Sequence, residues 1–160
     1  MNHLATSKED ILAASRDLIK ENGWAAVSIR AVASRCSVSA GTIYNYYESK
    51  ADLLSDTIES IWHEIFFHPE DEQIFHDVES CISWIYERLE YGNRQFPGFF
   101  SLHSFGFMRD EKTSGKKRMM KTWGHILNGL CEVLGNDPKV RADVFDQEFT
   151  EKKFADILFS

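Results

Sequence analysis

The stretch CSVSAGTIYNYYESK, residues 36–50, sets small residues beside three tyrosines and one asparagine. Ser39 can cap a helix that begins directly after it, because its hydroxyl accepts a hydrogen bond from a free amide of the first turn. Successive helical residues step by about 100° around the axis, so Ile43 and Tyr47 share the buried side with Ala40. The outward arc then carries small, hydroxyl, amide and phenol groups, from Gly41, Thr42, Tyr44, Asn45 and Tyr46. We therefore expect a short helix with a hydrogen-bonding outer face.

A second short helix is expected just before this one, with Ser28 as its cap, and it runs through Val32 and Ala33 to about Cys36. A turn of only about three residues separates the two helices. Two short helices joined by a tight turn, the second with a polar outer face, are typical of a helix-turn-helix whose second helix enters a major groove. Phenol and hydroxyl groups suit phosphate and thymine-methyl contacts, and Asn45 can pair with a base edge.

The rest of the chain shows helical rather than strand periodicity, so the sequence predicts an all-α protein. Thr6, followed three residues later by Glu9, predicts a capping box at the start of the first helix, and Gly23 predicts its end. Ser49 caps a long fourth helix that runs to the break at Pro69. Further periodic runs cover residues 74–91, 95–108, 116–134 and a last segment from about residue 150.

Composition limits the class of protein. The 160 residues are 43% apolar and 27% charged, which suits a soluble globular protein of one large or two small domains. Charge interrupts every apolar stretch, and residues 1–6 lack the features of a secretion signal, so we expect a cytoplasmic protein without a membrane segment. The odd number and wide spacing of Cys36, Cys81 and Cys131 favour reduced thiols over a disulfide framework or a zinc site.

Charge is unevenly distributed along the chain. Residues 1–50 carry six Lys and Arg against five Asp and Glu, whereas residues 51–160 carry 12 against 20. A phosphate backbone would repel the acidic part, so only the N-terminal part could face nucleic acid. Taken alone, however, the charge favours the simpler explanation that it keeps the protein soluble.

The order of several short motifs resembles the tetracycline-repressor (TetR) family of transcriptional regulators. The motifs are Val32-Ala33, the run VSAGTIYNYY at residues 38–47, and Ser49-Lys50 followed by Leu53-Leu54. The resemblance covers roughly residues 7–54, and beyond them only the order and length of the helices are similar.

The turn between the two short helices departs from the family pattern. Cys36 and Ser37 stand where the family usually has Ala-Gly, and Tyr47 replaces a phenylalanine. If this turn needs a positive φ, a non-glycine residue there costs stability, so Ser37 predicts a slightly altered turn.

The resemblance implies a DNA-binding domain at residues 1–49. In it, Arg30 and Lys50 would bring charge to phosphates, and Gly41 would allow close approach of the backbone. The simpler alternative is that the serines are only helix caps and that Lys50 is only a solvated side chain. The implied DNA-contacting residues are Ser28, Arg30, Ser39, Ala40, Gly41, Thr42, Tyr44, Asn45, Tyr46 and Lys50.

The resemblance also implies a helical regulatory and dimerisation domain at residues 50–160. In the family this domain usually continues with another long helix, which we expect these 160 residues to lack. The apolar faces of residues 116–134 and 150–159 are the expected homodimer interface. Aromatic crowding favours a small hydrophobic or aromatic effector, although the same residues can be plain core. The candidate effector-binding residues are Trp62, Ile65, Ile85, Phe99, His103 and Trp123.

The sequence therefore predicts a ligand-responsive transcriptional regulator that binds a palindromic operator as a homodimer and is released by an effector. A repressor is favoured, but the sequence alone does not distinguish a repressor from an activator. An enzyme is disfavoured, because the sequence has no phosphate-binding glycine loop or nucleophile elbow, and His63 and His68 splay across their helix. No metal or cofactor is expected. The alternative is a helical ligand sensor or partner-binding protein that no longer reads DNA, which the uncharged recognition face and Ser37 favour.

Overall fold

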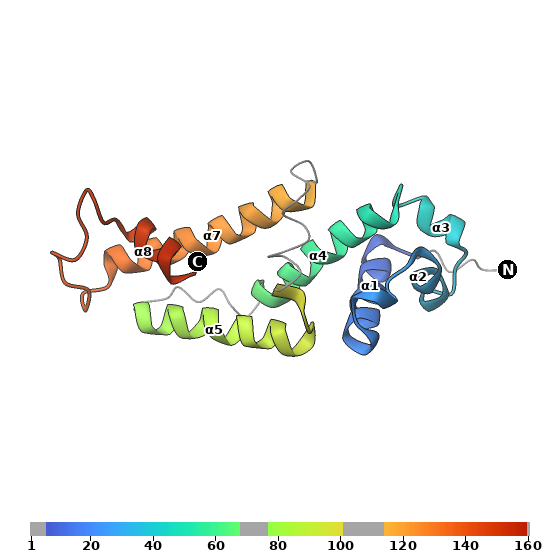
Figure 1. Cartoon of the computed structure of the whole chain (residues 1–160), viewed down its shortest axis with the longest axis horizontal. Coiled ribbons are helices and arrows are strands. Elements are labelled where there is room, and N and C mark those ends of the chain that lie inside the picture. Colours follow the sequence, from blue (N-terminus) through green and yellow to red (C-terminus); the bar gives the residue numbers. More distant parts are fainter. Residues whose placement is uncertain (1–5, 68–76, 101–113, 160) are drawn as a thin grey trace.

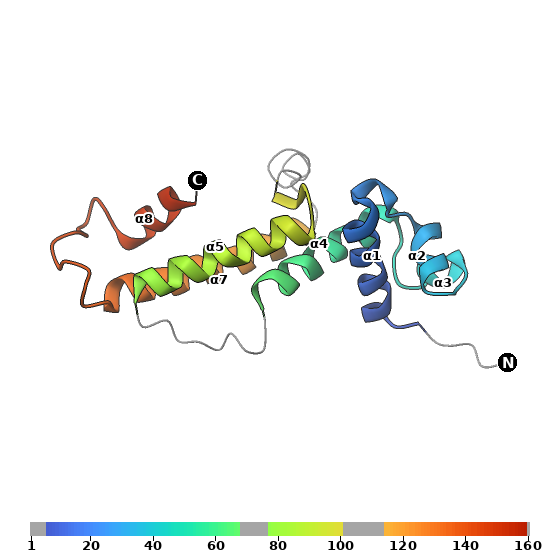
Figure 2. The same cartoon turned by 90° about the horizontal axis from the view of Figure 1, so that it is seen from below.

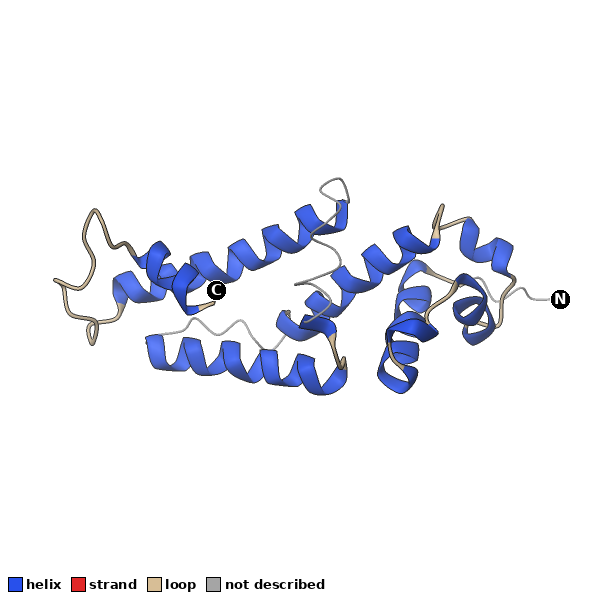
Figure 3. Ribbon diagram, in the orientation of Figure 1, coloured by secondary structure: helices blue, strands red, loops and turns tan. Residues whose placement is uncertain are grey.

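The computed structural model describes residues 6–67, 77–100 and 114–159. In these residues every regular element is helical, and a short helix-turn-helix region is followed by a C-terminal helical region (Figures 1 and 3). The all-α prediction is therefore confirmed. The elements are α1 (Lys8–Asn22), the 3-10 helix η1 (Trp24–Ala26), α2 (Ile29–Arg35), α3 (Ala40–Tyr44), α4 (Lys50–Phe66), α5 (Val78–Gln95), α7 (Ser114–Asn136) and α8 (Glu151–Leu158).

Serine caps set the starts of α2, α3 and α4 where the sequence predicts them. The hydroxyls of Ser28, Ser39 and Ser49 each accept a hydrogen bond, 3.1 Å long, from the backbone amide three residues further on. Each bond satisfies one of the amides that the first turn of a helix leaves unpaired, so these short elements are defined locally.

The predicted cap of α1 is wrong by one residue. Ser7, and not Thr6, caps the helix, and it forms the capping box with Asp10 rather than Glu9. The Asp10 carboxylate accepts from the Ser7 amide at 2.9 Å, while Thr6 is buried with 8% of its surface exposed. The pairs Thr6–Glu9 and Ser7–Asp10 both have the spacing of a capping box. Because Thr6 is buried, Ser7 and Asp10 form the cap.

The end of α1 lies where the sequence predicts it, at Gly23. Its φ of 78° is positive and its ψ of 177° is extended, so the residue turns the chain out of the helix rather than forming a left-handed helical cap. The Gly23 amide donates to the Ile19 carbonyl at 2.9 Å and closes the last turn.

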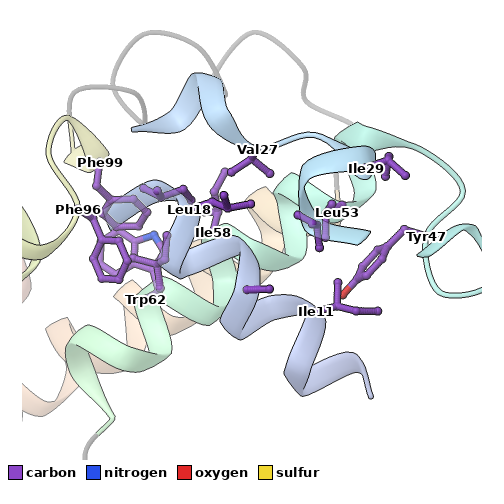
Figure 4. Packing of buried hydrophobic residues seen from close by; sticks show 14 of the residues in the cluster. Ile11, Leu18, Val27, Ile29, Tyr47, Leu53, Ile58, Trp62, Phe96 and Phe99 are labelled. Carbon is purple, nitrogen blue, oxygen red and sulfur yellow. The ribbon is translucent and has the colours of Figure 1, made fainter. Parts of the chain in front are cut away.

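The first three helices form a unit that we call the head (residues 6–49), and its core continues along α4. Ile11, Val32 and Ile43 are fully buried in the head, and Leu53 extends this core onto α4. Figure 4 shows the buried side chains continuing between α1 and α4 to a group of aromatic rings at the end of α5. One continuous hydrophobic core therefore joins the head to α4 and α5.

The helices α5, α7 and α8 form a unit that we call the body, and a second core lies between them. Ile85 from α5, Leu130 and Leu134 from α7 and Ala155 from α8 are at most 4% exposed. Figures 1 and 2 show α5 and α7 side by side, with α8 folded back along α7. The body thus needs all three helices to cover its apolar faces.

The boundaries in the body differ from the sequence prediction. Asp77 caps α5 by accepting from the Ser80 amide at 2.8 Å, so the helix starts at Val78 and continues to Gln95 rather than covering 74–91. The buried carboxylate of Asp137, beyond the end of α7, accepts from the Val78 amide at 2.8 Å. These two carboxylates satisfy the first amides of α5, which hydrophobic periodicity alone does not reveal. The predicted helical segment from 101 to 108 lies outside the described residues.

Candidate nucleic-acid interface

The short helix α3 buries one face and exposes the other, as its sequence predicts. Ile43 is fully buried and Tyr47 is 4% exposed, whereas Tyr44 and Tyr46 are 55% and 44% exposed. The helix ends at Tyr44, so Asn45 and Tyr46 lie in the turn that follows it rather than on a longer helix. The outward face is therefore made partly by α3 and partly by this turn.

The residues at the start of α3 lie on or near the same outward face. Ser39 and Gly41 are exposed, and Ala40 and Thr42 are half-buried. The hydroxyls of Ser39 and Thr42 lie 3.0 Å apart, and either can donate to the other. Ser28 is half-buried at the start of α2, where its hydroxyl serves as the helix cap. The structure thus gives both serines the capping role that the sequence offered as the simpler alternative.

The turn between α2 and α3 places Ser37 at a positive φ of 56°, and no other non-glycine residue in the described part of the chain has one. Backbone bonds fix this conformation, because the Val38 amide donates to Ala33 at 2.9 Å and the Ser37 amide donates to Ser34 at 3.1 Å. The left-handed region is where an L side chain is strained. The prediction that this turn position needs a positive φ is therefore confirmed.

Tyr46 is connected to the rest of the head by its hydroxyl. The phenol donates to the backbone carbonyl of Thr6 at 2.5 Å. Its proton is therefore engaged within the chain, while half of the side chain remains exposed. A phosphate that met this hydroxyl would have to replace Thr6 as its acceptor.

Most cations of the head are already paired. Lys8 pairs with Asp56 at 2.6 Å, Arg16 and Lys20 pair with Glu64, and Arg35 pairs with Glu21. Across residues 6–67, 77–100 and 114–159, neither Arg30 nor Lys50 has an anionic partner, and both are exposed. Arg30 lies in the first turn of α2, and Lys50 is the first residue of α4. Two unpaired cations therefore lie on either side of α3, Arg30 on α2 of the head and Lys50 at the start of α4.

Two short helices, a tight turn, an exposed polar face and two unpaired cations together define a helix-turn-helix protein. The family described as "Bacterial regulatory proteins, tetR family" matches residues 11–57 of this chain. These residues belong to that family, which confirms the resemblance seen in the sequence motifs.

Curated relatives support the same assignment. The chain is 38% identical over 48 residues to the HTH-type transcriptional regulator UidR of Escherichia coli (strain K12), a match that covers 30% of this chain and 24% of that protein. It is 45% identical over 47 residues to the HTH-type transcriptional repressor KstR of Rhodococcus jostii (strain RHA1), covering 29% of this chain and 22% of that protein. The chain thus spans less than a quarter of these relatives. No solved structure matches it significantly.

The candidate effector-binding residues fall into different surroundings. Trp62 and Phe99 are buried together, with ring centroids 5.5 Å apart, and Trp123 lies 6.0 Å from Trp62. Ile65 is fully buried against Gly92. His103 lies outside the described residues. The structure therefore brings the three rings into one aromatic cluster and leaves Ile85 elsewhere.

Ile85 lines a cavity of about 240 Å³ between the end of α4, α5 and α7. The wall is mostly apolar, and its polar groups include the exposed His125 and the buried Cys81. Burial raises the pKa of the Cys81 thiol, which keeps it protonated and uncharged. The lining residues are Phe66, Phe67, Cys81, Trp84, Ile85, His125, Ile126, Gly129 and Leu130.

Sequence reasoning missed most of this lining. Residues 81, 84 and 85, and likewise 126, 129 and 130, share a helix face by their i, i+3 and i+4 spacing, and this is the signal that could have found them. The sequence does not say which two faces meet, because α5 and α7 are separated by a long stretch of chain.

The described residues contain no group of three His, Cys, Asp or Glu side chains placed to hold a metal ion. The ring of His63 instead stacks on Phe67, with centroids 5.1 Å apart. The three cysteines are free thiols. None of the helices in the part of the chain that the structure describes has the length and apolar character that crossing a membrane requires.

Proposed function

We propose that this protein is a ligand-responsive transcriptional repressor that binds a palindromic operator as a homodimer in the cytoplasm. The observation that carries the proposal is the exposed hydrogen-bonding face of α3, with the unpaired Arg30 and Lys50 on the helices beside it. Regulators of the tetR family are in general DNA-binding proteins without enzymatic activity. Residues 1–49 act as the DNA-binding domain and residues 50–160 as the regulatory and dimerisation domain.

The proposed contacts follow from exposure and chemistry. Arg30 and Lys50 bind phosphates, because among the cations of residues 6–50 these two have no competing anion in the described part of the chain. Tyr44 and Asn45 project from the exposed end of α3 and reach base edges or methyl groups. The remaining contacts position the backbone on the duplex, from Ser28, Ser39, Ala40, Gly41, Thr42 and Tyr46.

The cavity between α4, α5 and α7 is the proposed effector site. Its apolar wall favours a hydrophobic or aromatic compound, and its volume of about 240 Å³ favours a small one. Phe66 lies in this wall and also contacts the aromatic cluster, with its ring centroid 5.2 Å from that of Trp62. A bound compound would thus touch the C-terminal end of α4. The same helix begins at Lys50, beside α3.

The proposed dimer uses residues 116–134 and 150–159. Ile157 on α8 is 63% exposed although its neighbour Leu158 packs on the second core, so α8 keeps an apolar group on its outer side. A dimer is needed because a single head carries few free cations and one recognition helix reads only a few base pairs.

The test is selection of duplexes from a random pool by the full chain, followed by affinity measurements over a range of salt concentrations. Arg30→Ala and Lys50→Ala should each weaken binding evenly across sequences. Each should also lower the salt slope by about two, because the substitution removes one phosphate contact from each of the two heads of the dimer. Arg94→Ala, which removes an exposed cation from α5, is the matched control and should change neither quantity.

One observation favours a second function, a ligand sensor that does not read DNA. Four of the six cations in residues 6–50 are ion-paired within the chain, and the Tyr46 proton is engaged by Thr6. Failure to enrich any duplex, together with binding of apolar compounds in the cavity, would support the sensor over the repressor.

A further inference from the structure

A single carboxylate on α4 binds groups from two other helices. Glu64 accepts Arg16 Nε at 2.8 Å and Lys20 Nζ at 2.6 Å, both from α1 in the head. The Tyr91 hydroxyl of α5 donates to the same carboxylate in a long hydrogen bond of 3.4 Å. Glu64 is therefore the point at which charged and polar groups of the head, α4 and the body meet.

Neighbouring contacts reinforce this meeting point. Lys20 Nζ also lies 4.9 Å from the ring centroid of Phe96, at the end of α5. Next to it, Trp24 Nε1 donates to the Pro97 carbonyl at 3.2 Å, and the Trp24 ring stacks on Phe99 with centroids 5.8 Å apart. The head is thus held to the end of α5 through α1 and η1, and not only through the chain connection at α4.

We propose that Glu64 is a positioning residue that sets the orientation of the head relative to α5. The reason is electrostatic, because Arg16 and Lys20 lie one turn apart on α1 and share this one carboxylate. Without its charge the two cations repel each other and turn toward solvent. The apolar packing of α1 on α4 and the Lys8–Asp56 pair remain, so the head stays attached but can rotate relative to α5. In a DNA-bound dimer this orientation determines the distance between the two recognition helices, and in this respect the inference rests on the proposed function.

The same residue connects the head to the cavity. Glu64 lies two residues before Phe66, which lines the cavity, and Tyr91 precedes Gly92, where α4 and α5 are in close contact. A methyl group at Gly92 would lie 2.6 Å from Ile65 Cδ1. A compound that separates α5 from α4 at the cavity must therefore also strain the Tyr91 contact with Glu64. The effect of binding then extends to the head, because Glu64 also holds Arg16 and Lys20.

The first test measures orientation without DNA. Residual dipolar couplings of backbone amides in α1, α2, α3 and α5 report how the head lies relative to the body. In the full-length Glu64→Gln chain, the couplings within the head should still fit the wild-type head, while the angle between the head and α5 changes beyond experimental error. Glu90→Gln breaks the exposed Glu90–Arg94 pair on α5 with the same change of charge, and it should leave this angle unchanged.

The second test uses the selected operator with its half-sites moved together or apart by one base pair. The ratio of the affinities for the selected and the shifted spacing should be about tenfold lower in Glu64→Gln than in the wild type, which lies within the usual range of coupling between sites. Glu90→Gln should keep the wild-type ratio. A loss of stability alone would lower the affinity for every spacing equally. Tyr91→Phe removes only the contact from α5 and provides a milder variant, with a smaller rotation, should Glu64→Gln fold poorly.

The outcomes separate the two proposals. An unchanged angle between the head and α5 in both Glu64→Gln and Tyr91→Phe would overturn the role of Glu64, whether or not DNA is bound. A wild-type chain that selects no duplex would overturn the proposed function, and the angle measured in Glu64→Gln would still decide the role of Glu64.

Discussion

The hydroxyl of Tyr46 donates to the backbone carbonyl of Thr6 at 2.5 Å and so holds the turn after α3 against the residues just before α1. These residues are 40 positions apart in the sequence. The bond fixes the phenol against the head while leaving 44% of the side chain exposed. The same residue therefore contributes to the stability of the head and to its outward face.

Tyr46→Phe should lower the free energy of unfolding by about 0.5–1.5 kcal/mol, the usual net value of one hydrogen bond. Operator affinity should also fall, because the turn that carries Asn45 is held less firmly. Tyr44→Phe is the control, since Tyr44 is more exposed, at 55%, and it should leave stability unchanged. Urea unfolding followed by circular dichroism measures both variants, and equal midpoints would show that the bond to Thr6 does not stabilise the head.

Ser37→Gly should stabilise the protein. The φ of 56° at this position strains an L residue, and glycine removes about 1 kcal/mol of that strain. Ser34→Gly is the matched control, because Ser34 is exposed within α2, where glycine in place of serine costs about 0.5 kcal/mol. The two variants should shift the thermal midpoint in opposite directions, and a loss of stability in both would argue against strain at Ser37.

The head is the part of the fold that the sequence predicts best, for a local reason. Ser28, Ser39 and Ser49 each form a cap with an amide three residues away, so the pattern and the structure depend on the same short stretch. The start of α5 depends instead on Asp137, which is distant in the sequence. Local periodicity contains no information on such a partner.

The candidate interface likewise has local features that the sequence predicts and long-range features that it does not. The exposure of Tyr44 and the burial of Ile43 follow from their angle on one helix, and the structure agrees with both. The engagement of the Tyr46 proton by Thr6 and the pairing of Arg16 with Glu64 depend on how helices pack. The unpaired state of Arg30 and Lys50 could be inferred only after the other cations of the head had found their partners.

Gly92→Ala should destabilise the protein by about 1–3 kcal/mol, the usual cost of adding a methyl group to a packed core. Its added carbon would lie 2.6 Å from Ile65 Cδ1 and 3.0 Å from the ring of Phe100, and Ile65 is fully buried. Gly124→Ala on α7 is the control, because a methyl group there meets no atom within 4 Å. Alanine should stabilise α7 by up to about 1 kcal/mol. Chemical unfolding compares the two, and a neutral Gly92→Ala would show that α4 and α5 can move apart without cost.

Acid should weaken the start of α5 through Asp77. Hydrogen bonds from the Ser80 backbone and side chain lower the pKa of this carboxyl from 3.8 to about 2, and Lys139 adds to the effect. A lowered pKa in the folded protein means that the stabilisation is present above 3.8 and is lost as the pH falls toward about 2. Asp77→Asn keeps a side chain that can cap a helix but removes the titrating group. Urea midpoints of the wild type should therefore fall more steeply than those of Asp77→Asn across this pH range, and parallel curves would mean that Asp77 does not link the fold to pH.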